Sequence, residues 1–122
     1  MRIVLIAVLG SVGALARFEM SKAISQQTDR VGVPTTVVNL TGAVLLGLVL
    51  GVDDQRPIEP DLLAGVAIGF LGGFTTFSTW MVDVVVLAER RRRGTVQAVL
   101  NLAITLFGGI GGYALARMLV AS

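Results

Sequence analysis

Four apolar runs, each long enough to cross a bilayer, occupy most of this 122-residue chain. A transmembrane helix needs about 20 mostly apolar residues to span the hydrocarbon core. The sequence predicts such helices at residues 3–24, 32–52, 62–88 and 96–120, separated by short stretches rich in charged residues and proline. Because these stretches are short, we expect residues 1–122 to form a single all-α membrane domain.

The composition agrees with a membrane protein and argues against an enzyme. Hydrophobic residues make up 54% of the chain and charged residues 15%, whereas soluble domains carry about 25% charged residues. The chain has no histidine and no cysteine, which removes the commonest general base and every thiol nucleophile. No predicted span contains a pair of carboxylates. We therefore expect an integral membrane protein without catalytic activity.

Lysine and arginine are distributed unevenly between the two ends of the predicted helices. With four spans, both termini and the second loop share one side of the membrane, and the first and third loops share the other. Three such residues fall on the first side and seven on the second: Arg2, Arg56 and Arg117, against Arg17, Lys22, Arg30 and residues 90–93. This bias predicts that the first and third loops are cytoplasmic. We interpret the arginine run as a topology anchor or a contact with anionic lipids, and expect no nucleic-acid partner.

Asn39 is a polar residue close to the middle of the second predicted span. Its amide supplies two N–H donors and a carbonyl acceptor, and Thr35 lies four residues away on the same helix face. Polar groups are costly inside a membrane and therefore mark candidate functional sites. The alternative interpretation is a hydrogen bond that only holds two spans together.

The third predicted span contains a segment that forms helix poorly. Gly72 and Gly73 are followed by four hydroxyl residues within residues 75–79. Glycine costs about 1 kcal/mol of helix propensity relative to alanine, and hydroxyl groups can satisfy backbone groups released by a break. The pattern predicts a helix interrupted near residues 72–76, with free carbonyl groups available to a cation. The alternative is a continuous helix whose small residues allow close packing.

Three segments of the chain together resemble the CrcB/Fluc family of fluoride channels. They are residues 10–18 (GSVGALARF), Asn39 with Gly42 after it, and residues 72–79 (GGFTTFST), the last being the most specific. The resemblance covers essentially the whole chain. It implies a multi-pass protein of a prokaryotic cell membrane that exports cytoplasmic fluoride by passive electrodiffusion and thereby confers fluoride resistance.

The resemblance also implies an assembly and a bound cation. Family members are antiparallel dimers, in which two subunits of dual topology are inserted in opposite directions. They contain two fluoride pathways and one structural Na⁺, which is not transported, at the dimer centre. Gly72 and Thr75 match the residues whose backbone carbonyls bind this ion, in keeping with the preference of hard cations for oxygen ligands.

By the same resemblance, eight side chains belong to the fluoride pathway. Asn39 matches a pore-lining amide that donates to the anion, and Phe77 matches an aromatic ring whose edge carries partial positive charge. Arg17 matches a basic residue near the end of the first span, and Asp83 falls where the family usually has glutamate. The complete set is Asn39, Thr76, Phe77, Ser78, Thr79, Trp80, Arg17 and Asp83.

Three features depart from the family pattern and leave a second assembly open. Trp80 stands where the family has phenylalanine, and Asn101 stands where many relatives carry tyrosine. The uneven distribution of lysine and arginine is also large for a subunit that inserts in both directions. The alternative is a non-conducting or half-active subunit of a heteromeric fluoride channel, paired with an oppositely oriented homologue.

A small multidrug-type transporter is a further alternative, because such proteins also have four spans and form inverted dimers. Their proton-coupled mechanism needs a carboxylate inside the first span. The acid in this region, Glu19, lies beyond Arg17 and close to the first loop. This position argues against proton-coupled transport.

Overall fold

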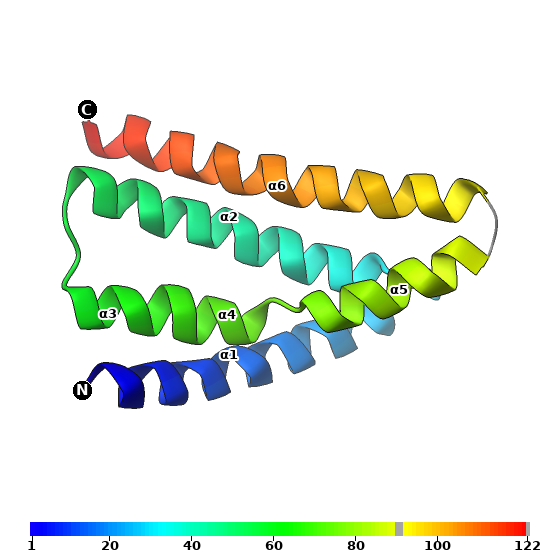
Figure 1. Cartoon of the computed structure of the whole chain (residues 1–122), viewed down its shortest axis with the longest axis horizontal. Coiled ribbons are helices and arrows are strands. Elements are labelled where there is room, and N and C mark those ends of the chain that lie inside the picture. Colours follow the sequence, from blue (N-terminus) through cyan, green and yellow to red (C-terminus); the bar gives the residue numbers. More distant parts are fainter. Residues whose placement is uncertain (90–91, 122) are drawn as a thin grey trace.

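The computed structural model describes residues 1–89 and 92–121, and in this part of the chain four helical spans run side by side (Figure 1). All four are long and apolar enough to cross a membrane. Three of them are single helices: α1 (Arg2–Ser25), α2 (Val33–Gln55) and α6 (Arg92–Ala121). The third span is composite and consists of α3 (Pro60–Ala64), the π-helical segment η1 (Gly65–Leu71), α4 (Gly72–Phe74) and α5 (Phe77–Glu89).

This architecture confirms the predicted all-α membrane fold with an interruption in its third span. Thr75 and Thr76 lie between α4 and α5, outside either helix, and the third span is bent by 29°. The antiparallel dimer involves a second chain and stays a prediction. The π-helical segment was not predicted, because its mixture of glycine and apolar residues does not distinguish it from an ordinary helix.

Local backbone requirements fix where two of the helices begin. Gly32 precedes α2 with φ of 84°, in the left-handed region that glycine adopts without a steric penalty. Glu59 precedes α3, and its carboxylate accepts hydrogen bonds from the backbone N–H groups of Asp61 (3.1 Å) and Leu62 (2.7 Å). Such capping satisfies N–H groups that have no partner within the helix.

The two chain ends lie at the same end of the molecule, together with the α2–α3 loop (Figure 1). Two ion pairs tie the helices there: Arg2 with Asp61, and Arg117 with Asp54, each at 3.1 Å. Both pairs are partly exposed, so each stabilises the fold by less than about 1 kcal/mol.

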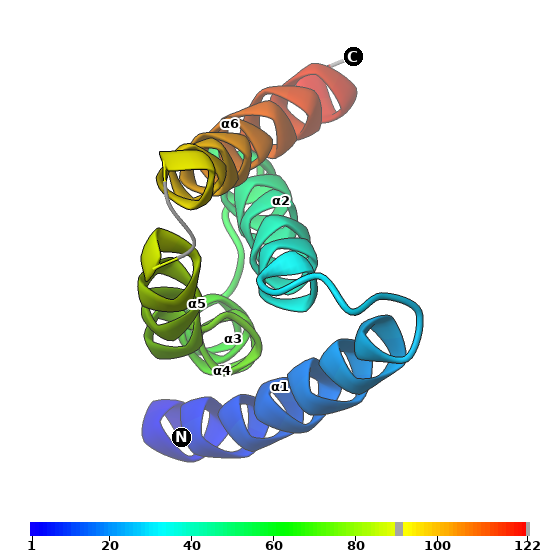
Figure 2. The ribbon, with the colours of Figure 1, turned by 90° about the vertical axis from the view of Figure 1, so that its right-hand side faces the viewer.

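Viewed end-on, α1 and α6 lie at opposite sides of the molecule, with α2 and the third span between them (Figure 2). The most extensive packing is between α2 and α6, where a Cβ added at Gly47 would overlap the Gly109 carbonyl. On the other side, a Cβ added at Gly13 of α1 would overlap the Phe70 carbonyl. The first contact holds α2 against α6, and the second holds the third span against α1 close to the interruption.

Candidate functional site

The third span stops being helical at Thr75, where the backbone turns to an extended conformation with φ of −82° and ψ of 158°. The Leu71 carbonyl accepts both the backbone N–H and the Oγ1 hydroxyl of Thr75, each at 2.9 Å. This double hydrogen bond closes the last turn before the break. The Thr75 carbonyl accepts no hydrogen bond within the described residues.

Asn39 of α2 contacts the backbone of Thr76 through both ends of its amide. Asn39 Nδ2 donates to the Thr76 carbonyl at 2.9 Å, and the Thr76 N–H donates to Asn39 Oδ1 at 2.9 Å. The Asn39 amide therefore pairs with both backbone polar groups of Thr76, as a residue of a neighbouring β-strand would. One Nδ2 hydrogen of Asn39 is left over, because the amide has two.

The Thr76 side chain caps the start of α5. Its Oγ1 accepts the backbone N–H of Thr79 at 3.3 Å and donates to Thr79 Oγ1 at 3.2 Å. Ser78 Oγ lies 3.4 Å from the same hydroxyl. Three of the predicted pathway residues thus form one hydroxyl cluster at the N-terminus of α5.

A cavity of about 340 Å³ lies beside the interruption, between α2, the third span and α6. Six of the ten predicted site residues line it: Asn39, Gly72, Thr75, Thr76, Phe77 and Trp80. The other polar lining comes from Thr36, Asn101 and Thr105. Asn101 and Thr105 were not among the predicted site residues, and their spacing of four residues on α6 is the signal that could have indicated them.

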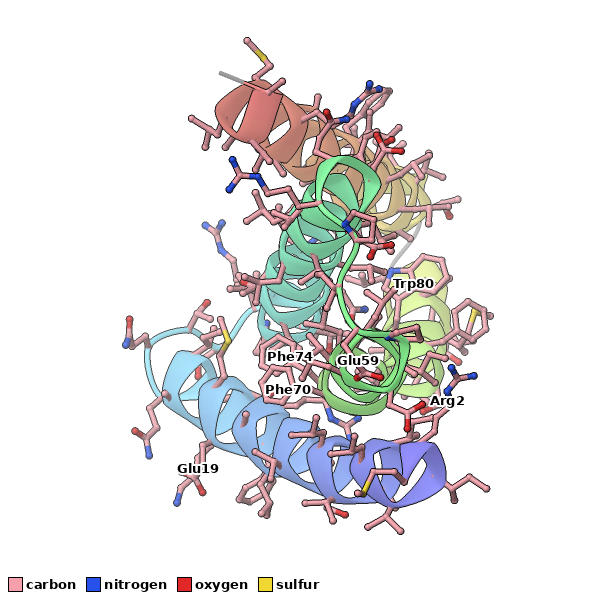
Figure 3. The ribbon with its side chains drawn as sticks, turned by 90° about the vertical axis from the view of Figure 1, so that its left-hand side faces the viewer. Arg2, Glu19, Glu59, Phe70, Phe74 and Trp80 are labelled. Carbon is pink, nitrogen blue, oxygen red and sulfur yellow. The ribbon has the colours of Figure 1, made fainter. Side chains whose placement is uncertain are left out.

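Two aromatic pairs occupy opposite sides of the third span. Phe70 and Phe74 stack with ring centroids 6.0 Å apart and lie on the side of α1 and α2, whereas Trp80 projects from the other side (Figure 3). Trp80 forms a tilted pair with Phe77 at 5.6 Å. Phe77 is 73% exposed in the single chain, so its ring is presented at the surface of the cavity and contributes little to the core.

Most hydroxyl groups in this cavity already use their hydrogen. Thr36 donates to the Gly32 carbonyl at 2.7 Å, and Thr105 donates to the Asn101 carbonyl at 2.9 Å. Within the described residues, the remaining side-chain N–H donors of the lining are the free Nδ2 hydrogen of Asn39, the Asn101 amide and Trp80 Nε1. The cavity can therefore offer N–H donors to a small anion.

Asp83 and Thr79 line a second, more polar cavity of about 400 Å³, formed by the end of α1, the first loop, the start of α2 and α5. Asp83 Oδ2 is buried and has no hydrogen-bond partner within the described part of the chain. Arg30 and Asp29 contribute charges to the same cavity. Arg17 is half-buried on α1, lines neither cavity, and forms no ion pair with any described carboxylate. Ser78 is exposed and also lies outside both.

A family model described as "CrcB-like protein, Camphor Resistance (CrcB)" matches residues 4–117. The chain belongs to the CrcB-like family. One curated relative, "Fluoride-specific ion channel FluC 2" of Mycolicibacterium paratuberculosis, is 39% identical over 84% of this chain and 82% of the relative. Symbiobacterium thermophilum has two, named FluC 1 and FluC 2. FluC 1 is 38% identical over 92% of this chain and 94% of its own length. FluC 2 is 35% identical over 93% of this chain and 93% of its own length.

In this CrcB-like chain, the three motif segments converge at the interruption. A Cβ added at Gly13, in the first motif, would overlap the Phe70 carbonyl, and one added at Gly73 would overlap the Gly10 carbonyl. Asn39, the second motif, bonds to Thr76 in the third. Motifs far apart in the sequence therefore contribute to one structural feature.

Proposed function

We propose that this chain is a subunit of a fluoride channel, which exports cytoplasmic fluoride passively through the cavity beside the broken helix. The proposal is carried by the lining of this cavity. Unused N–H donors and the Phe77 ring border one space within a membrane-spanning bundle. The names of the relatives, fluoride-specific ion channels, support the same anion. Such a protein is a channel and not an enzyme.

The chemistry of the lining favours the smallest halide. Fluoride loses a large hydration energy when it leaves water, and short hydrogen bonds in a low-dielectric site can offset that loss. The amides of Asn39 and Asn101 and the edge of an aromatic ring provide partial positive charge without a full cation. Chloride is too large to approach these donors at the same distance, and we therefore expect it to be excluded.

A single chain of four spans supplies too little wall to enclose a pore. We assign the missing wall to a second copy inserted in the opposite direction, the two-chain counterpart of an inverted repeat. Such a dimer would contain two equivalent pathways.

The carbonyl groups at the break suit a hard cation such as Na⁺, which prefers oxygen ligands. The Gly72 face is open, with nothing within 4 Å of an added Cβ, and the Thr75 carbonyl accepts no hydrogen bond within the described residues. Gly72 and Thr75 would hold the ion, whose charge would link two subunits and attract anions. In the described part of the chain, no group of three or more acidic, cysteine or histidine side chains offers a rival metal site.

A heteromeric channel is the second candidate, and Trp80 is the observation that favours it. The larger indole lies against Phe77 in the proposed pathway, and would narrow it. Relatives that occur as numbered pairs in one organism fit an assembly of two different subunits. In such an assembly this chain would contribute one half-active or inactive pathway.

Efflux from liposomes tests the function. The purified protein is reconstituted into vesicles loaded with potassium fluoride or potassium chloride, and valinomycin is added to dissipate the membrane potential. We expect rapid loss of fluoride from vesicles that contain the protein. Chloride should be retained to the same extent as in protein-free vesicles. Equal loss of both halides would contradict the proposal. Fluoride efflux only after co-reconstitution with an oppositely oriented homologue would identify the heteromer, and none in either case would refute both candidates.

A further inference from the structure

We propose that Asn39 and Thr76 hold the cation site open, by taking the N–H donors that would otherwise satisfy its carbonyl groups. Asn39 is then a positioning residue for the cation in addition to a residue of the anion pathway. The inference rests on the proposed function in one respect, since it takes Gly72 and Thr75 as the cation ligands. The experiment below separates the two.

The Gly72 carbonyl lacks the donor that a continuous helix would give it. In an α-helix each N–H donates to the carbonyl four residues earlier, so an uninterrupted third span would pair the Thr76 N–H with the Gly72 carbonyl. In this structure that N–H donates to Asn39 Oδ1 at 2.9 Å. Asn39 Oδ1 has therefore taken the donor that would otherwise bond to one proposed cation ligand, the Gly72 carbonyl.

The Thr75 carbonyl loses its helical donor in the same way. Its partner in a continuous helix would be the Thr79 N–H, which here donates to Thr76 Oγ1 at 3.3 Å. The Thr76 hydroxyl has thus taken the donor that would otherwise bond to the other proposed ligand, the Thr75 carbonyl. Both carbonyls are released because two side chains compete successfully for their donors.

Asn39 is suited to this role because it bonds to both polar groups of one residue. Its Nδ2 donates to the Thr76 carbonyl at 2.9 Å while its Oδ1 accepts the N–H, which fixes the orientation of the backbone at that position. The side chain comes from α2, which is itself packed closely on α6 through Gly47. Helix α2, which is well anchored on α6, therefore maintains the break in the third span. Because Asn39 also faces the anion pathway, its bonds to Thr76 would couple cation binding to that pathway.

Thermal unfolding across a series of Na⁺ concentrations tests this inference without measuring transport. A ligand that binds only the folded state raises the unfolding temperature as its concentration increases. The protein is held in detergent at constant ionic strength, with N-methyl-D-glucamine replacing Na⁺. We expect the Na⁺ concentration that produces a given rise in unfolding temperature to increase at least about tenfold in Asn39→Ala, which corresponds to about 1.4 kcal/mol of binding energy.

Two further comparisons keep the result interpretable. Thr41→Val is the matched control on α2, since the Thr41 hydroxyl donates to the Val37 carbonyl of its own helix at 2.8 Å, and its Na⁺ response should equal that of the parent. If Asn39→Ala does not purify as folded protein, the Na⁺ responses of Thr76→Val and Thr76→Ser test the inference instead. The valine variant loses the acceptor for the Thr79 N–H and should need more Na⁺, whereas the serine variant keeps it.

An unchanged Na⁺ requirement in both Asn39→Ala and Thr76→Val would overturn the inference. A parent protein whose unfolding temperature does not change with Na⁺ concentration would also overturn the inference. If that same preparation releases fluoride from vesicles, the channel proposal survives. Conversely, a Na⁺ response that depends on Asn39, in a protein without fluoride efflux either alone or with an oppositely oriented homologue, would refute the channel and leave this inference standing.

Discussion

Phe77→Ala should lower fluoride efflux by about tenfold or more without unfolding the protein, the equivalent of at least about 1.4 kcal/mol in the barrier to the ion. The ring lines the cavity beside the break, and its loss removes the partial positive charge that the ring edge offers to an anion. Since the side chain is 73% exposed in the single chain, its truncation leaves almost no void in the subunit core. Efflux from vesicles loaded with fluoride is the measurement.

Phe107→Ala is the matched control for this substitution. Phe107 is 69% exposed on α6 and lines neither of the cavities described above. The same truncation at this position should leave fluoride efflux at the level of the parent protein. If both variants conduct as the parent does, the ring of Phe77 has no part in the pathway.

Gly112→Ala and Gly111→Ala should change the stability of the fold in different ways, although the two glycines are adjacent in α6. A Cβ at Gly112 would lie 2.5 Å from the Val44 carbonyl oxygen, whereas an added Cβ at Gly111 meets nothing within 4 Å. The overlap involves backbone, which cannot move aside as a flexible side chain would. We expect Gly112→Ala to destabilise the protein by about 1–3 kcal/mol.

Gly111→Ala adds a methyl group in open space and improves helix propensity. Alanine is favoured over glycine by up to about 1 kcal/mol in a helix interior, so this variant should be as stable as the parent or more stable. Thermal unfolding of the two purified variants in the same detergent is the measurement. Equal destabilisation by both substitutions would contradict the contact between α2 and α6.

The architecture was predictable because its signals are local. The length of each apolar run predicts a spanning helix without any knowledge of its neighbours. The pair Gly72–Gly73 followed by hydroxyl residues predicts the interruption for the same reason, since poor helix propensity and alternative hydrogen bonds act within a few residues. The location of the break at Thr75 and Thr76 falls inside the predicted range of 72–76.

The partner of Asn39 was not predictable, because it depends on how two helices cross. The two interpretations left open by the sequence were a hydrogen bond between spans and a pathway residue, and the structure contains the hydrogen bond to Thr76, 37 positions away in the chain. It also places Asn39 in the lining of the cavity. Nothing in the spacing of residues 39 and 76 indicates that an amide and a peptide group will meet.

The positions of Arg17, Ser78 and Asp83 relative to the cavities also depend on how the helices pack. Arg17 and Ser78 were assigned to the pathway by resemblance, yet neither lines a cavity of the single chain, and their roles stay predictions for the dimer. Asp83 borders the second cavity with a buried oxygen. Which side of a helix faces a cavity is set by packing angles, which a motif does not encode.

The central claim is that the third span is interrupted at Thr75 and Thr76, and backbone chemical shifts of these two residues in bilayers test it most directly. Solid-state NMR of the labelled protein should give shifts typical of helix for Leu71 and Phe77 and of extended backbone for Thr75, whose ψ is 158°. Helical shifts throughout residues 71–79 would mean that the Gly72 and Thr75 carbonyls keep their helical partners, and would contradict the account.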